Sequence, residues 1–288
     1  MLPRYTTAQL YRFRGQTIPH QPITEDIHML LRPLLLLFLF AVLTACSSNP
    51  EDETAGMTVE ELYTTAKNRL DDADYEAAIN MYETLESRFP YGVYAEQAQL
   101  DIIYAYYKYD EPESAIIAAE RFIKLHPNHP KVDYAYYLRG LASYDGEMSY
   151  LYRLFNQDIS ERDPRSARRA FKFFARLVKK FPQSRYTPDA IQRMHNIRAD
   201  LAKYEIHVAD FYMRRKAFVA AANRATYVVE NFQGTPSVPT ALGIMVESYL
   251  QLGLNDLASD ALKVLKLNYP DSPITRKASK RLPSQPES

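Results

Sequence analysis

The chain has 288 residues with 35 basic and 35 acidic side chains, so its formal net charge is zero. A balanced charge excludes a general polyanion binder, and we expect no nucleic-acid partner. The charges are unevenly spread: residues 51–120 hold 17 acidic and 4 basic residues (net −13), and residues 161–216 hold 15 basic and 6 acidic residues (net +9). We therefore expect two surfaces with different partners; the alternative is a chance difference between solvated helix faces.

The first 45 residues predict a leader rather than a folded domain. Residues 1–28 contain prolines and lack periodicity, so we interpret them as a mis-set gene start or an extension. Residues 29–45 begin with methionine, carry a basic residue at Arg32 and contain an apolar run over residues 34–43. This pattern is typical of a lipoprotein signal peptide, because the apolar run is too short to cross a bilayer as a helix.

Cys46 is the only cysteine, and we predict that it carries a covalent lipid. The preceding residues, Leu43-Thr44-Ala45, resemble the bacterial lipobox, in which the thiol receives diacylglycerol and the new amine is acylated. Two or three acyl chains anchor a protein stably, whereas one chain is marginal. Residues 46–57 then predict a short, acidic, flexible tether. The alternative is a buried structural cysteine.

Five predicted helices end in an aromatic residue or a histidine: Phe89, His126, Phe181, Phe232 and Tyr269. Eleven residues before each of these lies an alanine: Ala78, Ala115, Ala170, Ala221 and Ala258. Seven residues after each alanine lies an apolar residue: Leu85, Phe122, Leu177, Val228 and Leu265. These positions form one face of an amphipathic helix, and alanine there lets a neighbouring helix approach closely.

Another helix precedes each of these five, over about residues 58–70 in the first case and 238–251 in the last. Helix, turn and helix at this period resemble the tetratricopeptide repeat. We therefore expect an all-α fold, a right-handed solenoid of about five helix pairs. Repeats 1–3 are expected over residues 58–182 and repeats 4–5 over residues 183–270.

Longer spacings between repeats predict inserted segments. Residues 145–163 are expected to form a loop that ends at Asp163-Pro164, with Asp163 as a helix N-cap and Pro164 at the first helical position. Residues 188–215 predict a lengthened first helix, and residues 271–288 predict a polar tail.

The first helices of such a solenoid usually present a peptide-binding face. Tyrosines are concentrated here, with twelve between Tyr91 and Tyr152. We predict that a groove for aromatic peptide segments is lined by Tyr63, Lys67, Tyr104, Tyr107, Lys108, Tyr137 and Tyr144. Tyr106 and Tyr136 are expected to pack inside, and packing is also the alternative for each tyrosine of the groove.

Signals of catalysis are few, and we expect no enzyme activity. Metalloprotease, nucleophile-elbow, phosphate-loop and dinucleotide motifs are absent from the sequence. His126 and His129 have a ligand-like spacing, but they lie in a proline-rich turn without a clear third ligand, so no metal site is predicted. Acidic residues are expected on solvated helix faces. Apart from the covalent lipid on Cys46, no cofactor is expected.

Several stretches resemble the BamD family. They are QLDIIYAYYK at residues 99–108, RFIKLHP at 121–127, Asp133-Tyr134, Arg139-Gly140-Leu141, Asp163-Pro164, Ala167-Arg168 and LAKYE at 201–205. The resemblance covers about residues 60–270 and includes the lipobox. It implies a non-enzymatic scaffold of the machinery that assembles β-barrel proteins in the outer membrane of Gram-negative bacteria.

The resemblance also implies a location and partners. Members are held by their lipid at the inner leaflet of the outer membrane and face the periplasm. The absence of aspartate after Cys46, where Ser47 and Ser48 follow, resembles the pattern of lipoproteins sorted to that membrane. Their C-terminal repeats dock a POTRA domain of a BamA-like barrel protein, and their N-terminal repeats receive targeting segments of unfolded outer-membrane proteins. Accessory assembly lipoproteins and outer-membrane lipid complete the expected partners. We assign the contact with the barrel protein to Arg193, Arg198, Arg214 and Arg215.

One observation opposes the peptide site, and two other functions are open. The net charge of −13 would repel a carboxyl-terminal segment unless Lys67, Lys108 or Arg121 receives its carboxylate. A pilotin-like repeat lipoprotein that escorts a secretin or pilus component would share the lipobox and the fold. A helical lipoprotein enzyme acting on peptidoglycan is the more distant alternative, since it would need a positioned carboxylic acid in a cleft.

Overall fold

The computed structural model describes residues 54–145 and 164–282. All the described helices belong to one compact unit within residues 56–288. Cys46, the predicted leader and residues 146–163 of the predicted loop lie outside the described residues. The division into repeats 1–3 and 4–5 stays a prediction.

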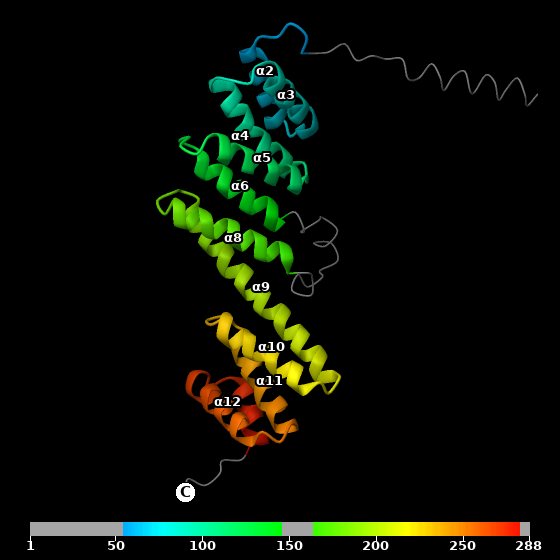
Figure 1. Ribbon diagram of the computed structural model, residues 1–288, viewed down its shortest axis with the longest axis vertical. Coiled ribbons are helices and arrows are strands. Elements are labelled where there is room, and N and C mark those ends of the chain that lie inside the picture. The colour runs from blue at the N-terminus through cyan, green and yellow to red at the C-terminus, as the bar shows by residue number, and fades with distance from the viewer. Residues whose placement is uncertain (1–53, 146–163, 283–288) are drawn as a thin grey trace, which may run out of the picture. The chain divides into compact units, whose positions relative to one another are not determined.

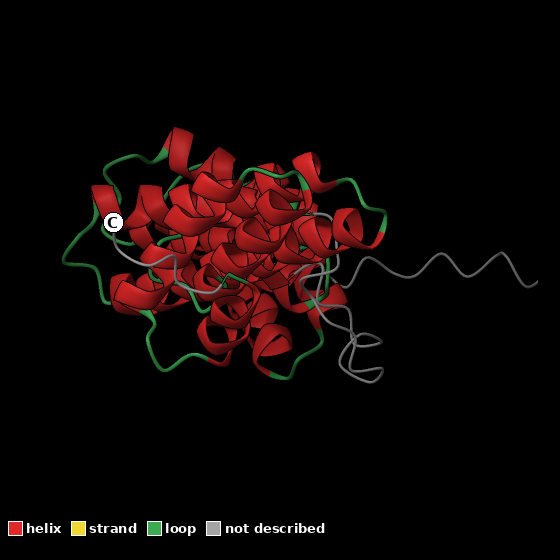
Figure 2. Cartoon of the chain, turned by 90° about the horizontal axis from the view of Figure 1, so that it is seen from below, coloured by secondary structure: helices red, strands yellow, loops and turns green. Residues whose placement is uncertain are grey.

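The described helices form pairs along the chain (Figure 1). They are α2 (Val59–Asp71) with α3 (Tyr75–Arg88), α4 (Val93–Lys108) with α5 (Pro112–Leu125), α6 (Val132–Asp145) with α8 (Arg165–Lys180), α9 (Thr187–Arg214) with α10 (Phe218–Asn231) and α11 (Val238–Gln251) with α12 (Asn255–Asn268), followed by α13 (Pro273–Arg281). Figure 2 shows the described ranges as helices and loops without strands.

Each described helix packs on the next one in the chain. The first helices of the pairs also pack on one another, α2 on α4, α4 on α6 and α9 on α11. A repeat that contacts mainly its neighbours is typical of a solenoid. The prediction of an all-α helical-repeat solenoid is therefore confirmed, and its handedness stays a prediction. None of the described helices is both long and apolar enough to cross a membrane.

Local sequence explains where the helices begin and end. At the start of α2, Thr58 N donates to Glu61 Oε2 at 2.8 Å and Glu61 N donates to Thr58 Oγ1 at 3.3 Å, a reciprocal capping box. All five predicted ending residues occupy the C-cap positions of second helices. The predicted lengthened helix is α9, with 28 residues. Pro164 is the N-cap of α8 rather than its first helical residue, so that placement was wrong by one position.

The core confirms the alanine pattern. The five predicted alanines have no exposed surface, and the five apolar residues that follow them are at most 1% exposed. Tyr136 is buried as predicted, whereas Tyr106 is only partly buried against the core. Residues 273–281 of the predicted polar tail form α13, which buries Thr275 and Ala278 against α11 and α12.

Gly140→Ala should destabilise the protein by about 1–3 kcal/mol. The added methyl group would lie 2.4 Å from Cε1 of Phe174, and Phe174 has no exposed surface. The better helix propensity of alanine, about 0.8–1.0 kcal/mol, offsets only part of this cost. Urea unfolding followed by circular dichroism measures the change. Gly140→Ala should cost less in a Phe174→Leu background, and equal costs in both backgrounds would contradict the steric explanation.

Candidate functional site

The seven residues predicted to line a peptide groove all lie on the first helices of the N-terminal pairs. Tyr63 and Lys67 are on α2, Tyr104, Tyr107 and Lys108 on α4, and Tyr137 and Tyr144 on α6. The five tyrosines are partly buried against the core, and Lys108 is exposed. Because α2 packs on α4 and α4 packs on α6, the structure brings the seven onto three neighbouring helices.

Asp101 organises the part of this surface formed by α2 and α4. Its carboxylate accepts a hydrogen bond from the hydroxyl of Tyr63 at 2.9 Å and another from Nε2 of Gln97 at 2.8 Å. Burial raises the pKa of Asp101 despite these bonds. Burial, followed by the charge and hydrogen bond of Asp101, raises the pKa of Tyr63. The Tyr63 side chain is therefore held as a neutral hydrogen-bond donor with a fixed ring orientation.

Three tyrosines stack where α6 meets the start of α9. The ring of Tyr186 lies between Tyr134, at a centroid distance of 5.2 Å, and Tyr137, at 4.8 Å. The hydroxyl of Tyr137 donates to Asp189 Oδ2 at 2.7 Å, and Nε of Arg193 donates to the same oxygen at 2.7 Å. Burial, then the bond and charge of Asp189, raises the pKa of Tyr137 to about 12. The structure thus joins a predicted peptide-binding residue and a predicted partner-binding residue through one carboxylate.

The acidic residues of the N-terminal half are shared equally between helices, with five on α3 and α5 and five on α2 and α4. Glu83 and Glu86 are on α3, where Glu83 accepts from the hydroxyl of Tyr106 and Glu86 pairs with Arg121 of α5. Lys67 pairs with Asp71 on its own helix. Of the three cations proposed to receive a carboxylate, Lys108 is the one that forms no ion pair within the described ranges.

The four arginines assigned to the barrel-protein contact differ in their surroundings. Arg193 pairs with Asp189, and Arg198 donates to the carbonyl oxygens of Asn231 at 3.1 Å and Gln233 at 3.4 Å. The guanidinium of Arg215 lies over the ring of Phe211 at 4.5 Å, and Arg214 is exposed at the end of α9. Arg198 therefore also ties α9 to the end of α10.

Glu205 contradicts the expectation that acidic residues lie on solvated faces. It is 1% exposed, and its two carboxylate oxygens accept from Nη2 of Arg168 at 3.1 Å and from Nη1 of Arg224 at 3.0 Å. This bridge joins α8, α9 and α10. Its position could have been found from the sequence, because Glu205 lies on the buried stripe that contains Ala202 and Ala209.

Glu205→Gln should destabilise the protein by about 1–3 kcal/mol, because two arginines would lose their shared carboxylate. The two arginines are nearly half exposed and can regain water, so the loss should lie below that of a fully buried pair. Glu247→Gln is the matched control, since it removes a surface pair with Arg281 and should cost less than about 1 kcal/mol. Equal losses in urea unfolding would show that burial of Glu205 is unimportant.

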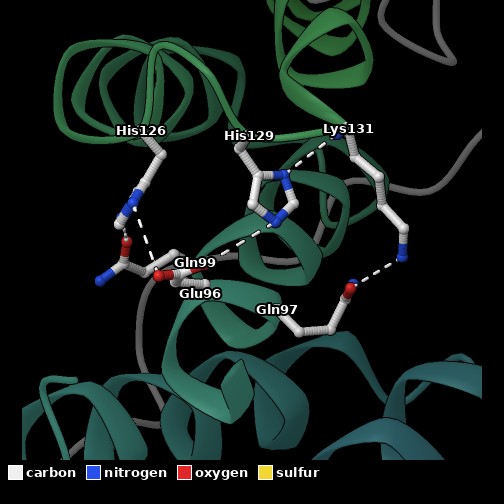
Figure 3. Close-up of polar contacts among 6 residues, drawn as sticks. All are labelled: Glu96, Gln97, Gln99, His126, His129 and Lys131. Carbon is white, nitrogen blue, oxygen red and sulfur yellow. Dashed lines mark hydrogen bonds and ion pairs between the residues drawn. The ribbon is translucent and has the colours of Figure 1, made fainter. Parts of the chain in front are cut away.

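His126 and His129 lie in the turn between α5 and α6 and face α4 (Figure 3). His126 Nε2 lies 2.9 Å from Gln99 Oε1, and His129 Nε2 lies 3.8 Å from Glu96 Oε2. His129 Nδ1 accepts from the backbone N of Lys131 at 3.1 Å. Within the described ranges, no three histidine, cysteine, aspartate or glutamate side chains are grouped so as to hold a metal ion. These contacts attach the turn to α4.

Acidification below about pH 6.5 should weaken folding through His129. Burial lowers the pKa of His129, so the folded chain binds fewer protons than the unfolded chain, and stability is lost as the pH falls from 6.5 toward the lowered pKa. We expect urea unfolding to show a smaller pH dependence for His129→Gln than for the unaltered chain. His195→Gln, at an exposed position on α9, is the control; a reduction of the same size in both variants would contradict a role for His129.

The described helices define a tetratricopeptide-like repeat protein with a tyrosine-rich surface on its first helices. Comparison places it more narrowly: the YfiO family, described as "Outer membrane lipoprotein", matches residues 55–265. The outer membrane protein assembly factor BamD of Neisseria meningitidis serogroup A is 44% identical over 245 residues, which cover 83% of this chain and 92% of that protein. BamD of Vibrio cholerae is 38% identical, covering 81% of this chain and 96% of its own. The chain therefore belongs to the BamD family.

Solved structures give weaker matches. A thermophilic tetratricopeptide-repeat protein of Thermus thermophilus is 14% identical and covers 78% of this chain and 99% of its own, with a TM-score of 0.34. A score this low supports no argument, so the fold assignment depends on the helix packing described above.

Proposed function

We propose that this protein is a lipid-anchored, non-enzymatic scaffold that takes part in assembling β-barrel proteins in the outer membrane. The observation that carries the proposal is the 44% identity to an outer membrane protein assembly factor over 92% of that factor. The matched family region, residues 55–265, includes the tyrosine-bearing helices α2, α4 and α6. A helical-repeat solenoid suits a scaffold, because its repeated faces offer extended docking surfaces.

The surface of α2, α4 and α6 is our proposed receptor for targeting segments of unfolded outer-membrane proteins. Tyrosine combines a flat apolar ring with a polar hydroxyl. The ring can pack on an aromatic side chain of a peptide while the hydroxyl bonds to its backbone. Tyr104 and Tyr107 lie near each other on α4, with ring centroids 6.5 Å apart, and Lys108 follows at the end of the helix. Lys108 is exposed and four residues after Tyr104, so the two share a helix face, a combination that supports recognition of an aromatic residue near a carboxylate.

The C-terminal helices are our proposed docking site for a POTRA domain of a BamA-like barrel protein. Arg214 and Arg215 at the end of α9 provide exposed positive charge, and Arg193 and Arg198 lie in the first half of the same helix. Charged groups at the edge of an interface mainly guide association and select partners. Accessory assembly lipoproteins are expected to bind other parts of the array.

The anchor in this proposal is the covalent lipid on Cys46, which would hold the chain at the inner leaflet of the outer membrane, facing the periplasm. Its support is the lipobox-like sequence before Cys46 and membership of a family described as outer membrane lipoproteins. Acyl labelling with Cys46→Ser as the control tests it, since label that persists without the thiol excludes this attachment.

Loss of the α4 rings should weaken peptide binding. We expect Tyr104→Ala with Tyr107→Ala to bind a synthetic carboxyl-terminal peptide of an outer-membrane β-barrel protein roughly tenfold more weakly, because each aromatic contact contributes about 0.5–1.5 kcal/mol. Fluorescence anisotropy measures the dissociation constant. Tyr91→Ala with Tyr109→Ala removes two exposed tyrosines on either side of α4 and should leave binding unchanged.

Thermal unfolding of both double variants separates lost binding from lost folding. Unchanged affinity in a folded Tyr104→Ala, Tyr107→Ala variant would remove the proposed peptide site. The wider function is tested by purifying the lipidated protein from native membranes with its partners. Recovery of a POTRA-containing barrel protein in near-equal amounts is expected, whereas recovery of a secretin would replace the assembly scaffold with the pilotin-like alternative.

A further inference from the structure

Helix α8 carries an unusual excess of positive charge. Residues 165–180 hold seven basic residues and no acidic residue. The apolar side of α8 is used for folding, because Ala170, Phe174 and Leu177 are buried in the core. The basic side of α8 therefore faces outward, and the packed apolar side holds the helix in place. This helix differs from α9, which carries the arginines predicted to bind the barrel protein.

Only part of this charge is compensated by neighbouring acids. Arg168 shares Glu205 with Arg224, and Arg169 pairs with Glu113 through both of its terminal nitrogens, at 3.2 and 2.5 Å. Lys172 and Arg176 form no ion pair with any residue that the structure describes. Both are exposed and are four residues apart, so they lie on the same face of α8.

A cavity of about 300 Å³ lies among these side chains. Five basic residues and one aromatic ring line it: Arg165, Arg168, Arg169, Lys172, Arg176 and Phe173. The lining residues recur at intervals of three or four along α8, as expected for one helical face. The surface that lines the cavity is mostly apolar, formed by the Phe173 ring and the aliphatic stems of the basic side chains, whose charged groups surround it.

A buried arginine behind the ring adds to the positive field. Arg139 of α6 is 4% exposed, and its guanidinium carbon lies 4.2 Å from the centre of the Phe173 ring. Its Nη1 donates to Glu120 at 3.4 Å, whereas its Nε and Nη2 have no hydrogen-bond partner among the described residues. Burial lowers the pKa of Arg139, and the nearby charge of Arg176 acts in the same direction. This side of the molecule has more positive charge than its own acids neutralise.

We propose that this α8 cavity binds the phosphate group of an anionic phospholipid headgroup. Guanidinium groups match phosphate oxygens in pairs of hydrogen bonds, and an ammonium group adds a compact charge. A phosphate is small enough for several cations to reach at once. An acidic protein segment would meet one aromatic ring and the aliphatic stems of basic side chains here, whereas tight protein interfaces centre on several buried aromatic or arginine anchors. Basic side chains near an anionic membrane are each attracted to it.

This contact is separate from the predicted lipid on Cys46. The lipid would hold the chain near any bilayer, whether neutral or anionic, whereas the α8 cavity would respond only to the anionic headgroup. A second, reversible contact would bring the repeats close to the membrane surface rather than leaving them on a free tether. Because the apolar side of α8 is already packed, the helix would lie on the headgroups without inserting.

Lysine acetylation of the lipidated full chain on vesicles tests the proposal. The protein is reconstituted on phosphatidylcholine vesicles with or without phosphatidylglycerol, and mass spectrometry follows acetylation of Lys172. Phosphatidylglycerol should slow the acetylation of Lys172 several-fold. Lys263 and Lys266, exposed lysines of α12, are controls within the same molecule and should react equally on both vesicles. Flotation with neutral vesicles reports the anchor independently.

A variant adds a second measurement. Arg176→Gln should raise the amount of phosphatidylglycerol needed for half-maximal protection of Lys172 about fivefold, the effect of removing one basic residue near an anionic surface. Lys266→Gln is the matched control and should not change it. Thermal unfolding confirms that both variants fold.

Three other outcomes overturn the proposal in distinguishable ways, and a fourth concerns the anchor alone. Equal acetylation of Lys172 on both vesicles would exclude a headgroup site. Protection by inorganic phosphate on neutral vesicles, without protection by phosphatidylglycerol, would assign the cavity to free phosphate. Protection by an acidic peptide alone would make α8 a protein-docking surface. Failure to float with neutral vesicles would contradict the anchor on Cys46 and would not by itself affect the α8 cavity.

Discussion

Close approach between helices is the constraint on which the rest of this structure depends. Each second helix places an alanine with no exposed surface at the same point of its sequence, from Ala78 in the first pair to Ala258 in the last. A larger side chain there would separate the two helices of a pair and shift every later repeat. The same constraint acts at Gly140, where the ring of Phe174 occupies the space of a missing side chain. Because these contacts fix each pair, the first helices α2, α4 and α6, which carry the tyrosines, pack on one another.

The sequence predicted the parts of the fold that depend on local pattern. Each second helix contains its own alanine, the apolar residue that follows and the C-cap residue. A single segment of the chain therefore shows the whole pattern. The stack of Tyr134, Tyr186 and Tyr137 could not be predicted in this way, because it joins residues about fifty positions apart across two helices. The stripe on α9 indicates the buried position of Glu205, but its two partners could not be predicted, because Arg168 and Arg224 come from α8 and α10. The sequence contains all three residues but does not show that they contact one another.

Local charge on the tyrosine surface differs from what net charge suggested. The acidic residues of the N-terminal half are largely used by neighbours, as Glu83 is by Tyr106 and Glu86 by Arg121. Those that lie on the first helices, such as Asp101, accept hydrogen bonds and hold tyrosines in place. A side chain that is already fixed loses less conformational entropy when it binds a ligand. In the proposed peptide surface, Asp101 therefore acts as a hydrogen-bond acceptor that holds a tyrosine in place.

Asp189 makes the start of α9 a junction between the two predicted binding surfaces. Its Oδ2 accepts from Tyr137, which belongs to the proposed peptide surface, and from Arg193, which belongs to the proposed partner surface. A ligand that draws the hydroxyl of Tyr137 away leaves Asp189 paired with Arg193 alone, and a partner that takes Arg193 leaves it bonded to Tyr137. Each change alters the electrostatic environment of the residue, Tyr137 or Arg193, that stays bonded to Asp189. One carboxylate oxygen therefore connects a residue of each proposed surface through hydrogen bonds of 2.7 Å.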